Sequence, residues 1–254
     1  MRDRISVSEI YGPVVQGEGA VIGRPTVFVR TGGCDYRCDW CDSLYAVLPR
    51  YRDTWVRMGT EEVFAEVRRL SEKPILVTLS GGNPALQPLG GLIERGREEG
   101  YTFAVETQGS VAKDWFGGLD HLTLSPKPPS SGMETDWGKL GRCLEAAGER
   151  TSKIFKVVVF DDGDYAYARE VAIRFPEVSM YLQVGNDYLP GAAPHEVPEP
   201  DMSWLLDRYS WLAEKVIADG WNEVRVLPQL HVLVWEQARR VDIGKPRHGN
   251  PDLR

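Results

Sequence analysis

The amino-acid sequence predicts an α/β fold, a partial or incomplete (β/α) barrel in which most strands are parallel. Short runs rich in β-branched residues alternate with helical patterns along the 254-residue chain. This alternation is typical of a parallel sheet with helices outside it. Six or seven runs have the character of strands, which suits an incomplete barrel better than the full eight-stranded one. A doubly wound sheet is the competing architecture.

The expected strands are short, apolar and bounded by turn residues. They cover residues 26–30, 75–79, 102–106, 121–124, 154–160 and 180–184, with 223–227 as a seventh candidate. The polar, Gly-rich segment 15–19 (VQGEG) lies before any of these strands.

Apolar residues at helical spacing, together with end signals, define the expected helices. These helices cover residues 60–73, 86–99, 139–147, 164–174, 202–218 and 232–240. Thr60 is the expected N-cap of the first helix, with Glu61 and Glu62 in its first turn. Gly100 is placed to end the second helix. The proline-rich stretches 125–131 and 189–200 are expected to be loops.

Five of the expected strands run directly into a Gly-rich or polar cluster: TGGC, SGGNP, TQG, SPK and GND. The carboxyl ends of parallel strands meet at one face of an α/β fold, and that face carries the chemistry. We therefore expect these segments, which lie far apart in the sequence, to line one pocket.

Composition limits the classes of protein and of partner. The net charge of −7 and the dispersed basic residues argue against nucleic-acid binding. No run reaches the ~18 consecutive apolar residues of a membrane span, and the N-terminus lacks the apolar core of a secretory signal. We expect a cytoplasmic protein with one domain at residues 1–244 and a polar C-terminal tail at 245–254.

Three cysteines lie within eight residues, at Cys34, Cys38 and Cys41. Three thiolates are one short of a closed zinc site or a four-cysteine iron–sulfur cluster. A cubane cluster held by three cysteines leaves one iron open to a substrate or cofactor. A zinc knuckle that borrows a distant histidine and a simple electron-transfer cluster are the alternatives. Cys143, about a hundred residues downstream, is expected to be a structural thiol.

Other residues at the strand ends suit particular ligand groups. Arg30 ends a strand just before the cysteines, where its guanidinium is placed to fork onto a carboxylate. Gln16 and Glu18 complement the donors and acceptors of an amino-pyrimidinone edge. The glycines of Ser80–Pro84 allow backbone carbonyls to approach an ammonium group.

The C-x3-C-x2-C spacing, with aromatic Trp40 before the last cysteine, resembles the radical S-adenosylmethionine (SAM) superfamily. SGGNP resembles that superfamily's GGEP segment, with Asn in place of Glu. The combination of EIYGPVVQGEG, Arg30, CDYRCDWCDS, LSGGNP, ETQG, SPK, QVGN and LPQLH is more specific. It resembles the 7-carboxy-7-deazaguanine synthases over roughly residues 8–235.

This resemblance implies a fold of the radical SAM type. It also implies conversion of 6-carboxy-5,6,7,8-tetrahydropterin to 7-carboxy-7-deazaguanine, a radical ring contraction with loss of ammonia in queuosine and other deazapurine biosynthesis. The implied cofactors are a [4Fe–4S] cluster, SAM and Mg²⁺. The implied partners are an electron donor such as flavodoxin or ferredoxin and a second copy of the chain in a homodimer.

The resemblance also assigns residues. Cys34, Cys38 and Cys41 would hold the cluster, and the Ser43 hydroxyl would hold Mg²⁺, with a capping or turn serine as the alternative. Substrate would contact Val15, Gln16, Gly17, Glu18, Arg30, Ser80, Glu106 and His231. SAM would contact Trp40, Cys41, Asp42, Gly82, Ser125, Pro126, Lys127, Gln183 and Asn186. A ribose contact is the alternative for Glu106, and a structural role the alternative for His231.

Two rival functions remain. A glycyl-radical-enzyme activase shares the cysteine spacing but has no use for QGEG and Arg30. A noncatalytic iron–sulfur or zinc protein would bind metal without cleaving SAM. About twenty residues follow His231, which leaves open any role of the chain terminus in the pocket.

Overall fold

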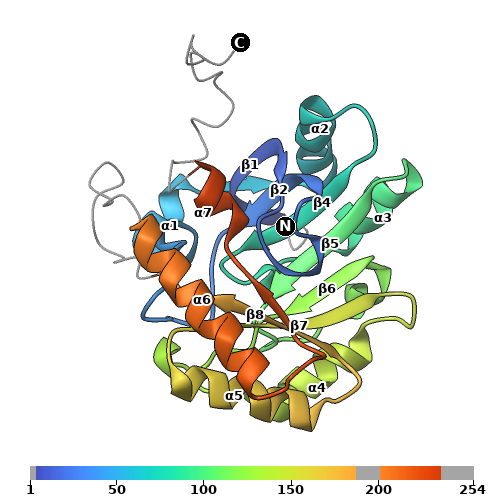
Figure 1. The fold of residues 1–254 in the computed structure, drawn as a ribbon. Helices are drawn as coiled ribbons and strands as arrows, with labels where there is room; N and C mark the ends of the chain where they lie inside the picture. The colour runs from blue at the N-terminus through green and yellow to red at the C-terminus, as the bar shows by residue number, and fades with distance from the viewer. Residues whose placement is uncertain (1–3, 187–200, 236–254) are drawn as a thin grey trace.

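The computed structural model describes residues 4–186 and 201–235. In this part of the chain, nine strands form one sheet in the order β3-β1-β2-β4-β5-β6-β7-β8-β9. From β2 to β9 every neighbouring pair is parallel. The sheet curves into an incomplete barrel, with α2 to α5 on its outer side (Figure 1). Because these strands follow one another without a reversal of order, the doubly wound alternative is wrong.

The strands are β1 (Ile5–Val15), β2 (Pro25–Thr31), β3 (Val56–Met58), β4 (Leu76–Gly81), β5 (Thr102–Thr107), β6 (His121–Leu124), β7 (Ser152–Val159), β8 (Ser179–Val184) and β9 (Arg225–Leu227). The α-helices are α1 (Leu44–Val47), α2 (Thr60–Leu70), α3 (Gly90–Glu98), α4 (Trp137–Ala146), α5 (Asp162–Arg174), α6 (Met202–Ala218) and α7 (Leu230–Trp235). Short 3₁₀ turns are η1 (Gly19–Val21), η2 (Pro49–Thr54), η3 (Pro84–Leu86), η4 (Asp114–Gly118) and η5 (Pro129–Ser131). None of the helices in the described residues has the length and apolar character that a membrane crossing requires.

Strand β1 corrects the expectation that segment 15–19 precedes every strand. It is eleven residues long and pairs antiparallel with both β2 and β3. Its register shifts between Tyr11 and Val14, where the intervening Gly12 and Pro13 interrupt the alternation that marks a strand. A bulge accommodates such residues without ending the strand.

Most helix boundaries differ from expectation by a few residues, and two of the differences have clear local reasons. Gly59, not Thr60, is the N-cap of α2, and its N–H donates to Glu62 Oε2 at 2.6 Å. Helix α3 begins at Gly90 rather than at residue 86, because Pro88 disfavours helical backbone in the residue before it. Only residues up to 235 of the last expected helix, 232–240, are described, and the 189–200 loop and the 245–254 tail lie outside the described residues.

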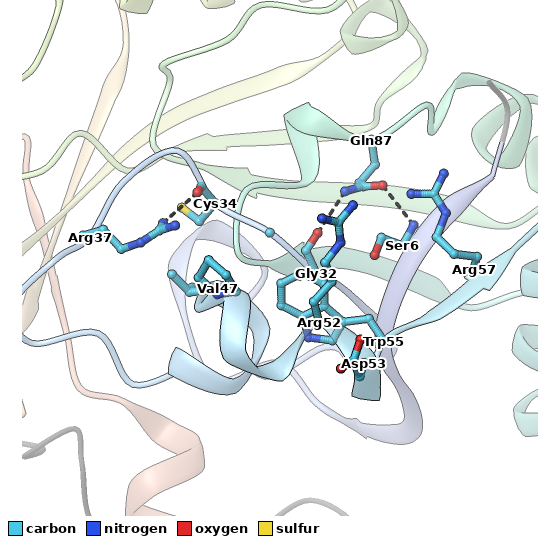
Figure 2. Close-up of a pocket in the computed structure, with 12 residues that line it drawn as sticks. Ser6, Gly32, Cys34, Arg37, Val47, Arg52, Asp53, Trp55, Arg57 and Gln87 are labelled. Carbon is cyan, nitrogen blue, oxygen red and sulfur yellow. Dashed lines mark hydrogen bonds between the residues drawn. The ribbon is translucent and has the colours of Figure 1, made fainter. Parts of the chain in front are cut away.

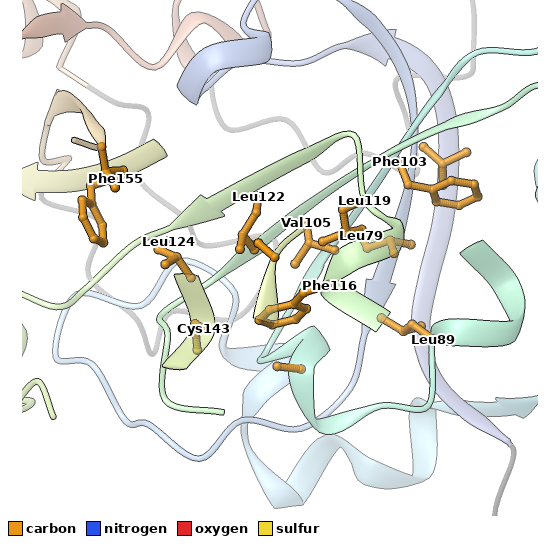
Figure 3. Close-up of a cluster of buried hydrophobic side chains, with 14 of the residues drawn as sticks. Leu79, Leu89, Phe103, Val105, Phe116, Leu119, Leu122, Leu124, Cys143 and Phe155 are labelled. Carbon is orange, nitrogen blue, oxygen red and sulfur yellow. The ribbon is translucent and has the colours of Figure 1, made fainter. Parts of the chain in front are cut away.

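The two faces of the sheet have opposite character. Alternate side chains on β4 to β8 pack outward with the helices in one apolar core, which includes Leu79, Val105, Leu122, Leu124 and Phe155 (Figure 3). The intervening residues point to the opposite face. Near the carboxyl ends of the strands these inward positions are polar: Arg30, Ser80, Glu106, Lys156 and Gln183. The fold thus places a polar site inside the barrel and its core outside.

Candidate active site

The cysteine loop follows β2 and is held by backbone contacts. Gly33 N–H donates to the carbonyl of Ala46 at 2.7 Å, and the Gly33 carbonyl accepts from Asn83 N–H at 2.8 Å. A Cβ on Gly82 would lie 2.1 Å from the Gly33 oxygen, so only glycine fits there. The close approach of the β2 and β4 ends therefore fixes the path of the loop.

Asn83 is fully buried and ties this loop to the next strand end. Its Nδ2 donates to Asp35 Oδ1 at 2.8 Å, and its Oδ1 accepts from Thr107 Oγ1 at 2.8 Å. Gln108 Nε2 also donates to Asp35 Oδ1, at 2.6 Å. The residue that departs from the superfamily's GGEP pattern thus supports the cysteine loop from behind. The presence of Asn where the superfamily has Glu was the sequence signal for this supporting role.

The three thiols fit a cluster by the chemistry of the donor set. Cys34, Cys38 and Cys41 are half-buried and free of disulfides. Burial raises the pKa of Cys34 and Cys38, and that of Cys41 to about 12, so metal binding must release the protons. Within the described residues no three His, Cys, Asp or Glu side chains already converge as a metal site.

Cys143 takes no part in this loop. It is fully buried on α4, and its thiol donates to the carbonyl of Gly109 at 3.4 Å. Its expected structural role is confirmed, and the loop supplies three thiols without a fourth.

The residues expected near SAM form a second wall beside the cysteine loop. Trp40 Nε1 donates to Ser130 Oγ at 3.0 Å, and Lys127 Nζ lies 5.6 Å from the Trp40 ring centre. Lys127 also donates to Ser125 Oγ at 3.0 Å. Pro126, which lies between Ser125 and Lys127 in the sequence, is buried. Asn186 lies just after β8. The SPK segment and the cysteine loop are therefore in contact.

Arg30 lies at the centre of a buried network. Its Nε donates to Glu9 Oε1 at 2.6 Å, its Nη1 to Ser43 Oγ at 3.1 Å and its Nη2 to Tyr11 Oη at 3.3 Å. Burial opposes the charge, but Tyr45, Tyr11 and Glu9 raise the pKa of Arg30 above its usual value. The sequence analysis missed Glu9 because β1 was not recognised as a strand.

Ser43 occupies the N-cap position of α1 but makes no capping hydrogen bond with its side chain. Its hydroxyl donates to Asp42 Oδ1 at 2.8 Å and accepts from Arg30. The side chain is therefore engaged with the residues of the site and not with the helix end.

Glu18, Lys156 and Glu106 form an ion cluster inside the barrel, in which the lysine is buried. The Lys156 ammonium donates to Glu18 Oε2 and to Glu106 Oε1. Burial alone would raise the pKa of Glu18, but Lys156 and His231 hold it below its usual value. Glu106 and Glu18 raise the pKa of Lys156 although burial opposes its charge.

Lys156 was missed by the sequence analysis. It is 2% exposed and stands between apolar neighbours on β7. A single lysine inside the apolar run IFKVVVF was the available signal, because a buried lysine requires partners of opposite charge.

The QGEG segment meets the end of the described chain. Gln16 Oε1 accepts from the N–H groups of Gly17 and Glu18, at 2.7 and 3.2 Å. Gly17 accepts from Leu230 N–H at 3.1 Å, and a Cβ on Gly17 would lie 2.3 Å from His231 Nδ1. His231 Nε2 is 4.0 Å from Glu18 Oε1. His231 is thus held against the segment that carries Glu18.

Several buried polar atoms of the inner face have no hydrogen-bond partner in the described structure. They are Ser80 Oγ, both amide atoms of Gln183, and Gln229 Oε1. Buried polar atoms are normally paired, so these atoms indicate where a polar ligand fits.

A separate hollow of about 860 Å³ lies on the other side of the cysteine loop, against β1, β3 and η2 (Figure 2). Cys34 lines it together with Arg37, Arg52 and Arg57. Arg37 donates to the carbonyl of Cys34 at 2.7 Å. Asp53 also lines it, so arginines outnumber acids in this hollow although the chain is acidic overall.

A parallel, incomplete barrel with a three-cysteine loop at the carboxyl ends of its strands defines a radical SAM protein. Residues 28–127 match the radical SAM superfamily. Membership of this superfamily implies a [4Fe–4S] cluster and SAM as cofactors. The predicted fold class is confirmed at this level.

Full-length relatives narrow the class. The chain is 44% identical to the 7-carboxy-7-deazaguanine synthase of Bacillus subtilis, over 95% of this chain and 100% of the relative. It is 43% identical to that of Bacillus cereus, over 94% and 99%. The crystal structure of QueE from Escherichia coli shares the fold, with a TM-score of 0.64 and 21% identity over 90% of this chain and 95% of that one. The chain belongs to the 7-carboxy-7-deazaguanine synthase family.

Proposed function

We propose that this chain converts 6-carboxy-5,6,7,8-tetrahydropterin to 7-carboxy-7-deazaguanine with loss of ammonia, in queuosine and related deazapurine biosynthesis. Family membership supports the reaction. The observation that carries the proposal is that buried Arg30 and half-buried Glu18 both lie on the inner face of the barrel. A cation suits the substrate's carboxylate, and an acid suits its amino-pyrimidinone edge.

Substrate binding is assigned to the inner face of the barrel. Val15, Gln16, Gly17, Glu18, Arg30, Ser80, Glu106 and His231 would surround the pterin. The bonds of Gln16 Oε1 to its own loop fix the backbone that presents Glu18. The unpartnered Ser80 hydroxyl is available to the ligand. These residues bind, orient and exclude water from the substrate.

The cysteine loop and its second wall are assigned to the cofactors. Cys34, Cys38 and Cys41 would hold the [4Fe–4S] cluster, and Trp40, Cys41, Asp42, Gly82, Ser125, Pro126, Lys127, Gln183 and Asn186 would surround SAM. When bound, the reduced cluster and SAM supply the radical that removes a hydrogen atom from the substrate. The unpartnered Gln183 amide, 1% exposed, supports a polar ligand on the inner face of the barrel.

Mg²⁺ is assigned to Ser43. Its hydroxyl is not used to cap α1 and lies next to a carboxylate oxygen of Asp42. Mg²⁺ prefers oxygen ligands and takes few from the protein, so Ser43 and substrate oxygens are a suitable set.

An acidic flavodoxin or ferredoxin is assigned as electron donor. The hollow lined by Arg37, Arg52 and Arg57 borders Cys34 and has the complementary charge. We also assign a homodimer in the cytoplasm, a compartment that keeps free thiols reduced.

Anaerobic turnover tests the function. Reconstituted protein is incubated with 6-carboxytetrahydropterin, SAM, Mg²⁺ and dithionite, and the products are analysed by mass spectrometry. The mass of 7-carboxy-7-deazaguanine is the expected result. Cleavage of SAM without that product would mean that the enzyme acts on a different substrate, as an activase does. An intact cluster without SAM cleavage supports the noncatalytic alternative.

A further inference from the structure

Lys156 is the only inward-facing charge on β7 in the described structure, and both of its ionic partners come from other elements. Glu18 precedes η1 and Glu106 lies near the end of β5. The Lys156 side chain is 3% exposed, while those of Glu18 and Glu106 are 15% and 28% exposed. The lysine is therefore buried behind the two carboxylates, which lie nearer the open part of the barrel.

This arrangement answers an electrostatic problem. Two carboxylates that face the same enclosed site repel each other when both are ionised, and a cation between them offsets that repulsion. An ammonium has three donors and no acceptor, so Lys156 can satisfy both acids at once from behind. Without it, the inner face would hold two unpaired acids.

The carboxylate of Glu18 is also fixed from a second direction. Lys156 binds its Oε2, whereas Gln229 Nε2 donates to its Oε1 at 3.0 Å. With one oxygen held from β7 and the other from the segment before α7, the carboxylate cannot rotate freely. A carboxylate oxygen can accept more than one hydrogen bond, so these contacts do not prevent Glu18 from also binding a ligand.

We propose that Lys156 is a positioning residue that keeps Glu18 ionised and aimed into the barrel, where Glu18 accepts hydrogen bonds from the amino-pyrimidinone edge of the substrate. This inference rests on the proposed function. Lys156 acts through the two carboxylates and does not itself contact the substrate.

Lys156→Met tests this in the reconstituted holoenzyme. We expect the KM for 6-carboxytetrahydropterin to rise about 100-fold, as for the loss of one partner of a buried pair, while cluster content and the KM for SAM change less than about twofold. Lys153→Met on the same strand is the matched control, with kinetics like those of the parent. An unchanged substrate KM in Lys156→Met overturns the proposal.

A double-mutant cycle separates positioning from direct contact. In a Glu106→Gln background, one of the two acids that share Lys156 is already neutral. Adding Lys156→Met to this variant should therefore raise the KM for 6-carboxytetrahydropterin less than about tenfold. An equal effect in both backgrounds means that Lys156 binds substrate directly, which overturns the positioning role. The double variant also has no net change of charge, so it keeps the test valid if Lys156→Met alone does not fold.

The pH profile supplies a readout that loss of structure alone would not produce. Glu18 is faced by Lys156 from β7, Glu106 from β5, His231 from α7 and Tyr11 from β1. Without the lysine, the pKa of Glu18 rises, so the substrate KM of Lys156→Met should fall as the pH is raised, more steeply than in the parent. Parallel profiles contradict the proposal. If the parent makes no deazaguanine product, the proposed function fails, and that outcome is seen before any variant is made.

Discussion

The cysteine loop and the interior of the barrel are stabilised by different interactions. Backbone hydrogen bonds, a tight glycine contact and the neutral amide of Asn83 hold the loop. The interior is organised by buried charges, in the Arg30–Glu9 pair and the Glu18–Lys156–Glu106 cluster. Steric fit thus holds the proposed cofactor side of the site, while paired charges organise the proposed substrate side.

Gly82→Ala gives the largest expected effect, because it attacks the steric side of this comparison. The alanine Cβ would lie 2.1 Å from the Gly33 carbonyl oxygen. This oxygen belongs to the backbone, so it cannot move aside as the end of a flexible side chain could. We expect activity to fall about 100-fold or more, the effect of a misplaced reacting group, with less iron bound per chain. Iron content and turnover measure this.

Gly141→Ala is the matched control for Gly82→Ala. Gly141 lies in α4, and nothing stands within 4 Å of the added Cβ. Alanine is favoured over glycine in a helix by about 1 kcal/mol, so this variant should be as stable as the parent or more stable. A normal iron content in Gly82→Ala would show that the glycine contact does not position the loop.

Arg30→Ala attacks the electrostatic side. We expect kcat/KM for the pterin to fall about 100-fold, through loss of a charged hydrogen bond to the substrate and release of an unpaired Glu9. The iron content should stay normal, since Arg30 touches none of the cysteines in the described contacts. Arg24→Ala, a more exposed arginine that contacts His121, is the control. Parent kinetics for Arg30→Ala would remove it from the site.

Ser43→Ala sharpens the boundary between the two regions, because Ser43 bonds both Asp42 and Arg30. We expect the activation by Mg²⁺ to weaken several-fold, since the proposed magnesium site loses one oxygen ligand. Initial rates over a Mg²⁺ titration measure this. A magnesium response equal to that of the parent would count against the assignment.

Acid stability gives the smallest effect. The folded-state pKa of Glu18 is lowered, so its contribution to stability is present above the unfolded value of about 4.3 and is lost as the pH falls through the folded one. The Tm difference between the parent and Glu18→Gln should therefore shrink between pH 7 and pH 3.5. Glu66→Gln, from an exposed pair with Arg69, should show almost no difference at either pH. A constant difference for Glu18→Gln would contradict the lowered pKa.

The sequence predicted the strands of the parallel sheet well because each is a short apolar run between turn residues. It missed β1, since Gly12 and Pro13 interrupt the strand pattern and are accommodated only by pairing with β2. The cysteine loop was found because its ligands lie within eight residues. The ion cluster was not, because Lys156 and Glu18 are 138 residues apart and no local pattern links them.

The contact between Gln229 and Glu18 joins residues 211 positions apart in the chain. During synthesis, the three cysteines and the strands behind them leave the ribosome long before Gln229 and α7 do. The cysteine loop can therefore fold early, whereas the proposed pterin site is completed only when the last described helix has been made. A nascent chain would thus complete the proposed cluster loop before the proposed site that selects the substrate.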